Sequence, residues 1–191
     1  MASTVAIRTP QATLDDLAKV EGKAELVAGR IVSIMPSADL PSAAAFEIAV
    51  RLREYARAIG RGTAYPDGIG YALPTPLPGS NRQSFSPDAS FYDGVHPLNR
   101  MRFIEKVPVF TVEVRSENDY GALAEREMAE KRDDYFQAGT QIVWDVDPIA
   151  ETVAKYSASS PRKAVVFKRG ELADAEPALP GWRLKVDDIF A

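Results

Sequence analysis

Residues 107–146, VPVFTVEVRSENDYGALAEREMAEKRDDYFQAGTQIVWDV, decide the fold. They open with an apolar run at 107–114, which is typical of a buried strand. A helical pattern follows over 117–138, and Gly139 is placed to end it as a C-terminal cap. A second apolar strand is expected at 141–146. Two strands joined by a helix predict a parallel βαβ unit at the centre of a sheet.

The flanking segments extend this unit into a larger domain. Thr13 and Asp16 form a capping box that predicts a short helix to about Val20. Residues 25–35 predict a hairpin or a kinked strand pair. Residues 42–59 predict an amphipathic helix, whose apolar stripe is Ile48, Leu52, Tyr55 and Ile59. Further strands are expected at 64–73, 87–92, 152–157 and 163–168, with loops at 74–86 and 94–106. The tail should dock Trp182, Leu184 and Phe190. We therefore predict one α/β domain, residues 1–191, with a mixed central sheet flanked by helices.

Composition restricts the possible chemistry. The chain has no cysteine and a single histidine, His96, which excludes disulfides, thiolate metal sites, His-rich zinc sites and histidine-relay triads. A lone histidine base stays possible. The net charge of −4 argues against a protein that coats DNA, although a local basic face can lie on an acidic protein. The start of the chain does not resemble a signal peptide and no apolar run would span a bilayer, so we expect a cytoplasmic protein without a membrane partner.

Four arginines, Arg51, Arg53, Arg57 and Arg61, lie largely off the apolar stripe of the helix predicted at 42–59. They are either an ordinary solvated face or a ridge that contacts phosphates. The sequence does not choose between the two.

Two charged residues occupy positions where the pattern predicts burial. On the strand at 107–114, Glu113 and Arg115 share one face with Thr111, and a buried carboxylate is costly unless it is paired or binds a metal. On the following helix, Lys131 falls in the core-facing stripe, where a lysine is rare without an anionic partner. The alternatives are a structural salt bridge for Glu113 and a lysine that extends to solvent.

Asp88 follows Pro87 at the start of the strand expected at 87–92. A Pro-Asp pair alone is weak evidence, because it is usually a turn or a cap. Together with Glu113 and Lys131, however, it suits phosphodiester hydrolysis. Carboxylates are preferred ligands of Mg²⁺ and Mn²⁺, and a lysine can orient water or stabilise charge on the phosphate.

Pro87-Asp88 followed by Glu113-Val114-Arg115 resembles the signature of the PD-(D/E)XK nuclease superfamily. Within it, the chain is most similar to the Uma-type branch, bacterial proteins labelled putative restriction endonucleases. The resemblance covers nearly the whole chain and implies a restriction-endonuclease-like core. Its motifs are residues 25–29, 86–88, 112–114, Lys131 with Tyr135, 138–139 and 144–148.

The resemblance also implies roles for single residues. Asp88 and Glu113 would be metal ligands together with the carbonyl of Val114, and Lys131 would be the catalytic lysine. Glu25 would match the accessory glutamate near the metal, unless it is a solvated glutamate at a strand end. Arg115 stands where a lysine is usual, so it would grip phosphate or form a salt bridge.

The expected function is therefore Mg²⁺- or Mn²⁺-dependent cleavage of DNA by a homodimer. The branch often has a histidine ahead of its first long helix and an acidic residue before the later tryptophan. Residues 37–47 contain no histidine, and 141–143 read Gln-Ile-Val. These departures keep two rivals open. One is a catalytically weakened nucleic-acid-binding or assembly module, and the other is a metal-dependent hydrolase of another phosphate ester.

Overall fold

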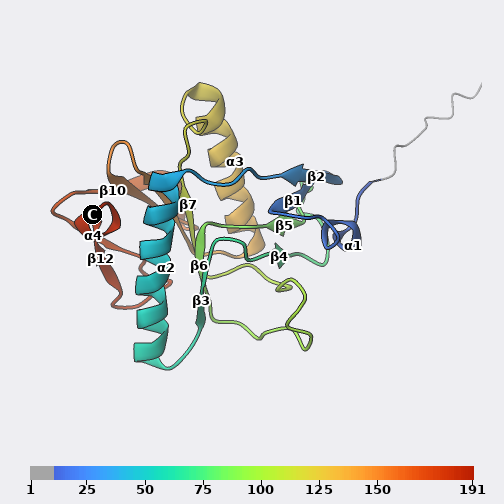
Figure 1. Ribbon diagram of the computed structural model, residues 1–191, viewed down its shortest axis with the longest axis horizontal. Helices are drawn as coiled ribbons and strands as arrows, with labels where there is room; N and C mark the ends of the chain where they lie inside the picture. Colours follow the sequence, from blue (N-terminus) through green and yellow to red (C-terminus); the bar gives the residue numbers. More distant parts are fainter. Residues whose placement is uncertain (1–10) are drawn as a thin grey trace, which may run out of the picture.

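The computed structural model describes residues 11–191, and a six-stranded mixed sheet lies at its centre (Figure 1). The strand order is β10-β9-β8-β7-β6-β3, so β10 and β3 are the edges. Only β7 and β8 pair in parallel, and every other neighbouring pair is antiparallel. The bounds of these strands are Thr63–Pro66 (β3), Ala89–Tyr92 (β6), Phe110–Val114 (β7), Ile142–Asp147 (β8), Thr152–Ser157 (β9) and Ser160–Lys168 (β10).

Two long helices cover the two faces of this sheet (Figure 1). Helix α2, Asp39–Ile59, packs against β3, β6 and β7, and helix α3, Ala122–Ala138, lies on the other face. Helix α3 connects β7 to the parallel β8, so the predicted βαβ unit is confirmed. It ends at Gly139, whose φ of 116° is the left-handed conformation expected of a C-terminal cap.

The remaining elements are short and lie on the two sides of the sheet, with β11, β12 and α4 on the α2 side and the others on the α3 side (Figure 1). On the N-terminal side, α1 begins with the predicted Thr13 capping box, and the predicted hairpin forms with a two-residue turn at 28–29. In the tail, Trp182 and Leu184 are buried as expected, and Phe190 packs against the core. These elements are α1 (Leu14–Leu17), β1 (Ala24–Val27), β2 (Arg30–Ser33), β4 (Tyr71–Ala72), β5 (Ser84–Phe85), β11 (Leu172–Asp174), β12 (Arg183–Lys185) and α4 (Val186–Ile189).

The two faces of the sheet differ in chemistry. Phe110 and Val112 of β7 and Trp144 of β8 point toward α2, where they form the main apolar core with Ile48 and Leu52. The alternate residues of the same strands point toward α3, as side chains on a strand must. That second face combines a smaller aromatic cluster with the half-buried Glu113 and with buried polar and charged side chains: Ser90, Thr111, Arg132, Asp134 and Asp145. It is the polar face of the fold that carries the candidate site.

The structure corrects several predicted boundaries. Helix α3 begins at Ala122 rather than 117, because Asp119 Oδ2 accepts hydrogen bonds from the backbone N–H and the hydroxyl of Ser116 and closes a turn first. The strand predicted at 64–73 is broken at 67–68, where Gly68 has a φ of 94°. Strand β5 lies inside the predicted loop at 74–86. Ile59, expected in the buried stripe, is 38% exposed at the end of α2.

No helix in residues 11–191 is both long and apolar enough to cross a membrane.

Candidate active site

Asp88 and Glu113 lie next to the last residue pair of the β6–β7 ladder. Ala89 of β6 pairs with Val112 of the antiparallel β7, and Asp88 and Glu113 are the residues adjacent to these two. The Asp88 N–H donates to the Val112 carbonyl at 3.0 Å, so the regular register ends here while Asp88 stays against β7. Both side chains therefore project from the same face, the one that α3 covers. Like charges in this position repel each other, so the pair needs compensating cations.

Helix α3 supplies two donors to the Glu113 carboxylate. Lys131 Nζ donates to Glu113 Oε2 at 2.8 Å, and the Tyr135 hydroxyl donates to Glu113 Oε1 at 2.7 Å. The two donors are four residues apart, so they lie on the same face of the helix. Tyr135 is fully buried and stacks on Phe85 with ring centroids 4.4 Å apart, which fixes its hydroxyl in place. The conflict between charge and burial at Glu113 and Lys131 is thus resolved by direct pairing.

Asp88 has its own cation, Lys23, which the sequence analysis missed. Lys23 Nζ lies 2.9 Å from Asp88 Oδ1 and 2.6 Å from Asp67 Oδ1. The other oxygen, Asp88 Oδ2, accepts the backbone N–H of Val114 at 2.8 Å. Burial lowers the pKa of Lys23. The negative charge of Asp88 and the hydrogen bonds from Lys23 to Asp67 and Asp88 outweigh this effect, so the pKa of Lys23 is raised overall. Lys23 therefore stays protonated.

Glu25 is the buried centre of a second part of the network. It is 5% exposed, so the alternative of a solvated glutamate at a strand end is wrong. Its Oε1 accepts the Ser86 N–H at 2.8 Å and lies 3.4 Å from Lys131 Nζ, while its Oε2 pairs with Arg82. Burial raises the pKa of Glu25. The charges of Lys131 and Arg82 and the hydrogen bond from Ser86 lower it by a larger amount, so the pKa is lowered overall. Arg82 also donates to Asp134 at 2.9 Å.

The site carries more negative than positive charge. Its carboxylates are Asp67, Asp88, Glu113, Glu25 and Asp134, and its cations are Lys23, Lys131 and Arg82. Five carboxylates thus share three cations, an excess of two negative charges. The excess is felt at Glu113, where burial together with the charges of Asp88 and Glu25 outweighs Lys131 and raises the pKa to about 7. Lys131 responds in the opposite sense: burial lowers its pKa, and the surrounding carboxylates raise it by more.

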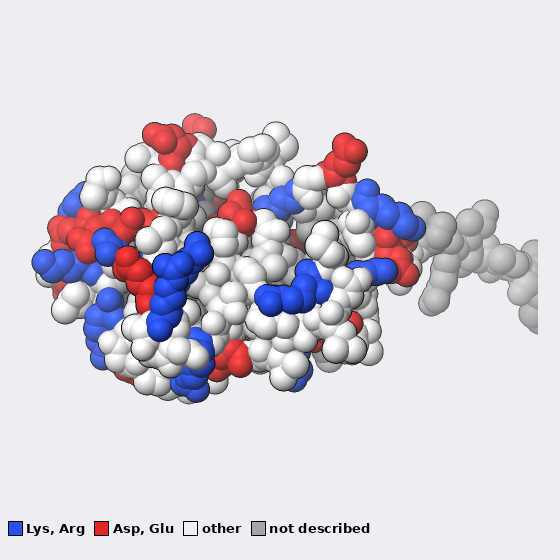
Figure 2. Space-filling view, turned by 60° about the horizontal axis from the view of Figure 1, so that its bottom comes forward, with Lys and Arg blue, Asp and Glu red and all other residues white. Residues whose placement is uncertain are grey.

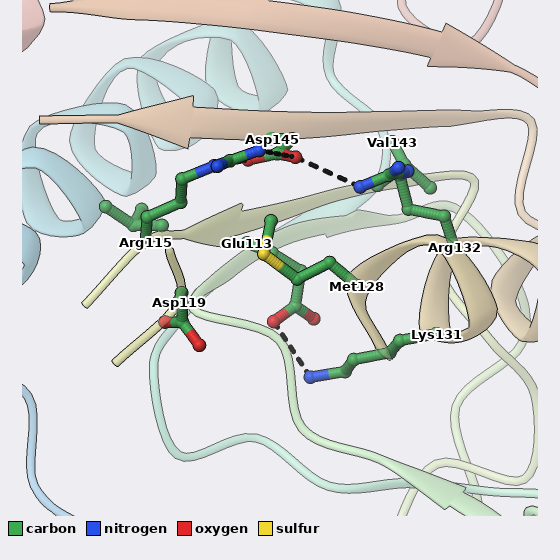
Figure 3. Close-up of a pocket in the computed structure, with 9 residues that line it drawn as sticks. Glu113, Arg115, Asp119, Met128, Lys131, Arg132, Val143 and Asp145 are labelled. Atoms are coloured by element: carbon green, nitrogen blue, oxygen red, sulfur yellow. Dashed lines mark hydrogen bonds and ion pairs between the residues drawn. The ribbon is translucent and has the colours of Figure 1, made fainter. Parts of the chain in front are cut away.

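A separate ionic cluster lies beside Glu113 on the next strand (Figure 3). Asp145, which pairs with Glu113 in the β7–β8 register, is 2% exposed. It accepts two hydrogen bonds from Arg115, at 2.8 and 2.9 Å, and one from Arg132 at 3.0 Å. Arg115 also pairs with Glu125. Of the two roles expected for Arg115, the structure shows the salt bridge. The contact of Arg115 with phosphate stays a prediction.

A cavity of about 120 Å³ separates the two clusters, with Glu113 and Asp145 on its floor and Lys131, Arg132 and Met128 of α3 beside it (Figure 3). A water molecule occupies about 30 Å³ of liquid, so this space admits a few waters or a hydrated cation, but not a nucleotide. No three carboxylates or histidines within residues 11–191 converge closely enough to form a metal site by themselves. The candidate donors are the carboxylates of Asp88 and Glu113 and the Val114 carbonyl; Glu113 and Val114 line the cavity, and Asp88 does not. These donors fit Mg²⁺, which keeps several waters and commonly takes only one or two carboxylates.

The comparisons with known proteins identify the family and the fold. Residues 12–187 match the Uma2 family, which is described as "Putative restriction endonuclease". The chain belongs to the Uma2 family. A solved structure described as a putative nuclease belonging to DUF820, from Anabaena variabilis, is similar with a TM-score of 0.71 and 20% identity. The similarity covers 93% of this chain and 97% of that one, and it confirms the fold. No curated protein matches the chain.

For this Uma2 protein, the structure brings four of the predicted site residues together: Asp88, Glu113, Lys131 and Glu25. The Val114 N–H contacts Asp88, which places this residue at the site too. Sequence reasoning missed Lys23 and Arg82. Both lie outside regular strands and helices, so no periodic pattern marks them. Arg132 and Asp134 could have been found, because they are charged residues on a helix whose neighbours Lys131 and Tyr135 were already expected to face the core.

Proposed function

We propose that the protein is a Mg²⁺-dependent endonuclease that hydrolyses phosphodiester bonds of DNA. One observation supports this most directly. Two carboxylates come together at the end of the β6–β7 ladder: Glu113 lies on β7, and Asp88, just before β6, accepts the N–H of Val114, while the ammonium of Lys131 is 2.8 Å from Glu113. Membership of a family described as putative restriction endonucleases points the same way. Asp88, Glu113 and the Val114 carbonyl would hold the metal, and the excess negative charge of the site suits a divalent cation.

A bound Mg²⁺ would polarise a phosphoryl oxygen and lower the pKa of a coordinated water. The chain supplies positioning and charge. Lys131 stays protonated because its pKa is raised, so it serves as a positive charge beside the reacting phosphate rather than as a proton acceptor. Glu25 is a second carboxylate partner of Lys131, with its Oε1 3.4 Å from the ammonium that donates to Glu113. Tyr135 holds the Glu113 carboxylate, which fixes the direction of its free electron pairs.

The structure bears on both rival functions. A hydrolase of small phosphate esters usually encloses its substrate, and a cavity of about 120 Å³ is too small for this. A nucleic-acid substrate that approaches the candidate site from the protein surface, without being enclosed, fits this small cavity better. The non-catalytic module has one observation in its favour, since both metal-ligand candidates already contact lysines. In that case the ionic network would only stabilise the fold.

Cleavage of a mixed pool of single-stranded, duplex and branched DNA tests the proposal. Cleavage should require Mg²⁺ or Mn²⁺, stop with EDTA, and be lost in Asp88→Asn, Glu113→Gln and Lys131→Met. Asp93→Asn is the matched control, because Asp93 is an exposed aspartate just beyond the other end of β6 and should leave cleavage unchanged. Cleavage that survives both Glu113→Gln and Lys131→Met would overturn the assignment of these residues.

Thermal unfolding separates the nuclease from the binding module without measuring activity. Mn²⁺ should raise the melting temperature, and Asp88→Asn should abolish the rise, since a ligand that binds only the folded state stabilises it. DNA binding without any response to metal would favour the non-catalytic module. We also propose a homodimer, because cutting both strands of a duplex requires two sites. Light scattering of the purified protein measures its mass directly.

A further inference from the structure

A groove of about 440 Å³ runs between α2 and the edge strand β3, outside the candidate active site. Its walls are the exposed side of the C-terminal half of α2 and the residues that lead into and through β3. Basic side chains line it, and the lining contains no acidic residue: Phe46, Ala49, Val50, Arg53, Ala56, Arg57, Gly60, Arg61, Gly62, Thr63, Ala64 and Pro66. Figure 2 brings the lower end of α2 forward and shows basic side chains over this part of the surface.

The three arginines of the groove differ from Arg51 of α2. Arg51 pairs with Glu47 and Glu54, which accounts for its charge. Within residues 11–191, Arg53, Arg57 and Arg61 make neither a salt bridge nor a side-chain hydrogen bond. Arg53 and Arg57 are four residues apart on one face of α2, and Arg61 follows the left-handed cap Gly60 just beyond the helix, so the three form a line of basic side chains in the groove. An ordinary solvated face tends to mix both signs of charge, and this line has only one.

The length of the line fits a polyanion. Arg53 and Arg57 are separated by four residues of helix, a rise of about 6 Å, and one strand of a DNA duplex carries a phosphate charge about every 3.4 Å of its axis. These two arginines would therefore lie along about two or three successive phosphates, and Arg61 continues the line beyond the end of the helix. Three cations placed in succession along a groove suit an extended polyanion better than a single small anion.

The groove also leads toward the candidate active site. Strand β3 pairs with β6, and its last residue, Pro66, is opposite Ala89, the residue after Asp88. The next residue, Asp67, contacts Lys23, and Lys23 contacts Asp88. The groove lies on the α2 side of the sheet and the two carboxylates on the α3 side, so a duplex that follows the groove to Pro66 would pass the end of β3 to reach them.

We infer that Arg53, Arg57 and Arg61 bind the phosphate backbone of a DNA duplex and direct it toward Asp88 and Glu113. This inference rests on the proposed function for its substrate. A second copy of the chain is a poorer occupant of the groove. Two such arginine lines would repel each other, and β3 is only four residues long and ends at a proline, which limits strand addition at this edge.

The test compares two triple variants that remove the same charge. Arg53→Gln, Arg57→Gln and Arg61→Gln are combined in one protein, and Arg162→Gln, Lys163→Gln and Lys168→Gln in the other. The second set is the matched control, because these exposed cations lie on β10, the opposite edge of the sheet. Binding of a short fluorescein-labelled DNA duplex is followed by anisotropy in EDTA over a range of salt concentrations, so that cleavage plays no part.

The groove variant should bind the duplex about tenfold or more weakly and lower the slope of log affinity against log salt by about 2–3, since each phosphate contact contributes about 0.9. The control variant should stay close to the unmodified protein. Equal losses in both variants, no change in slope, or no measurable duplex binding by the unmodified protein would each overturn the inference. So would a change of oligomeric mass confined to the groove variant, which would identify a second copy as the occupant.

The two proposals can fail separately. If metal-dependent cleavage is equally strong in both triple variants, the proposed nuclease function stands and the proposed role of the groove in DNA binding is refuted. Duplex binding that depends on the groove, without cleavage under any metal, would support the groove and contradict the nuclease.

Discussion

Replacing Asp145 by asparagine should destabilise the protein strongly although the shape of the side chain is kept. Asp145 is 2% exposed and accepts three hydrogen bonds from two guanidinium groups. Arg115 keeps Glu125 as a second partner. Arg132 keeps only its stacking on Tyr156, with 4.1 Å from its Cζ to the ring centroid, and its Nε has no partner within the described residues. The substitution therefore leaves a buried cation without a counter-ion.

The magnitude follows from this burial. Removing one member of a buried ion pair costs about 3–5 kcal/mol. With a urea dependence of about 2–3 kcal/mol per molar for a protein of this size, the unfolding midpoint should fall by about 1–2 M. The slope of the transition should stay the same, because the folded and unfolded states expose the same surface as before.

Urea unfolding followed by circular dichroism measures the effect, with Glu151→Gln as the control. Glu151 also pairs with an arginine, Arg169, through both carboxylate oxygens, but both partners are more than 40% exposed. The urea midpoint of the Glu151→Gln variant should hardly change, because water screens and solvates exposed charges. If Asp145→Asn costs no more than Glu151→Gln, the argument that burial gives the Asp145 cluster its strength is refuted.

Three further predictions concern the candidate site. Tyr135→Phe should weaken Mn²⁺ binding about 10–100-fold in calorimetric titrations, because the Glu113 carboxylate loses the hydroxyl that orients it; unchanged affinity would exclude this positioning role. Lys23→Met should increase the rise in melting temperature caused by Mn²⁺, because it removes a cation that occupies Asp88, and a smaller rise would contradict that view. Glu25 has a lowered pKa, so its charge stabilises the fold above its unfolded pKa of about 4.3, and this contribution is lost as pH falls through the folded value. The difference in unfolding free energy between the unmodified protein and Glu25→Gln should therefore be larger at neutral pH than in acid, and a difference independent of pH would contradict it.

The sequence predicted the parts of the fold that are set by periodicity. The apolar run of β7, the helical pattern of α3 and the apolar run of β8 are long enough for their periods to be clear, and their order requires a crossover. The break between β3 and β4 was missed because it depends on a two-residue turn at 67–68, where a glycine accepts a left-handed conformation. Strand β5 is two residues long, too short to show alternation, and it exists only because β4 pairs with it.

The candidate site was predictable to the extent that its residues violate a pattern. Glu113 and Lys131 stand out because a charge in a buried position is unexpected on a strand or a helix. Asp88 rested mainly on the family resemblance, since one aspartate after a proline has no pattern to violate. Lys23 and Arg82 are brought to the site by the hairpin of β1 and β2 and by the loop before β5, that is, by tertiary contacts that no local signal encodes.

Glu113 and Asp145 show why burial of a carboxylate does not by itself identify a functional group. They are neighbours in the β7–β8 register, both lie under α3, and both contact its basic residues. Asp145 faces two guanidiniums that fill its hydrogen-bonding directions. Glu113 faces one ammonium, one phenol and two other carboxylates, and desolvation together with the charges of Asp88 and Glu25 raises its pKa. A divalent cation would offset the like charges around Glu113, whereas at Asp145 it would meet two guanidiniums, which is why we propose a catalytic role only for the first of these two neighbouring acids.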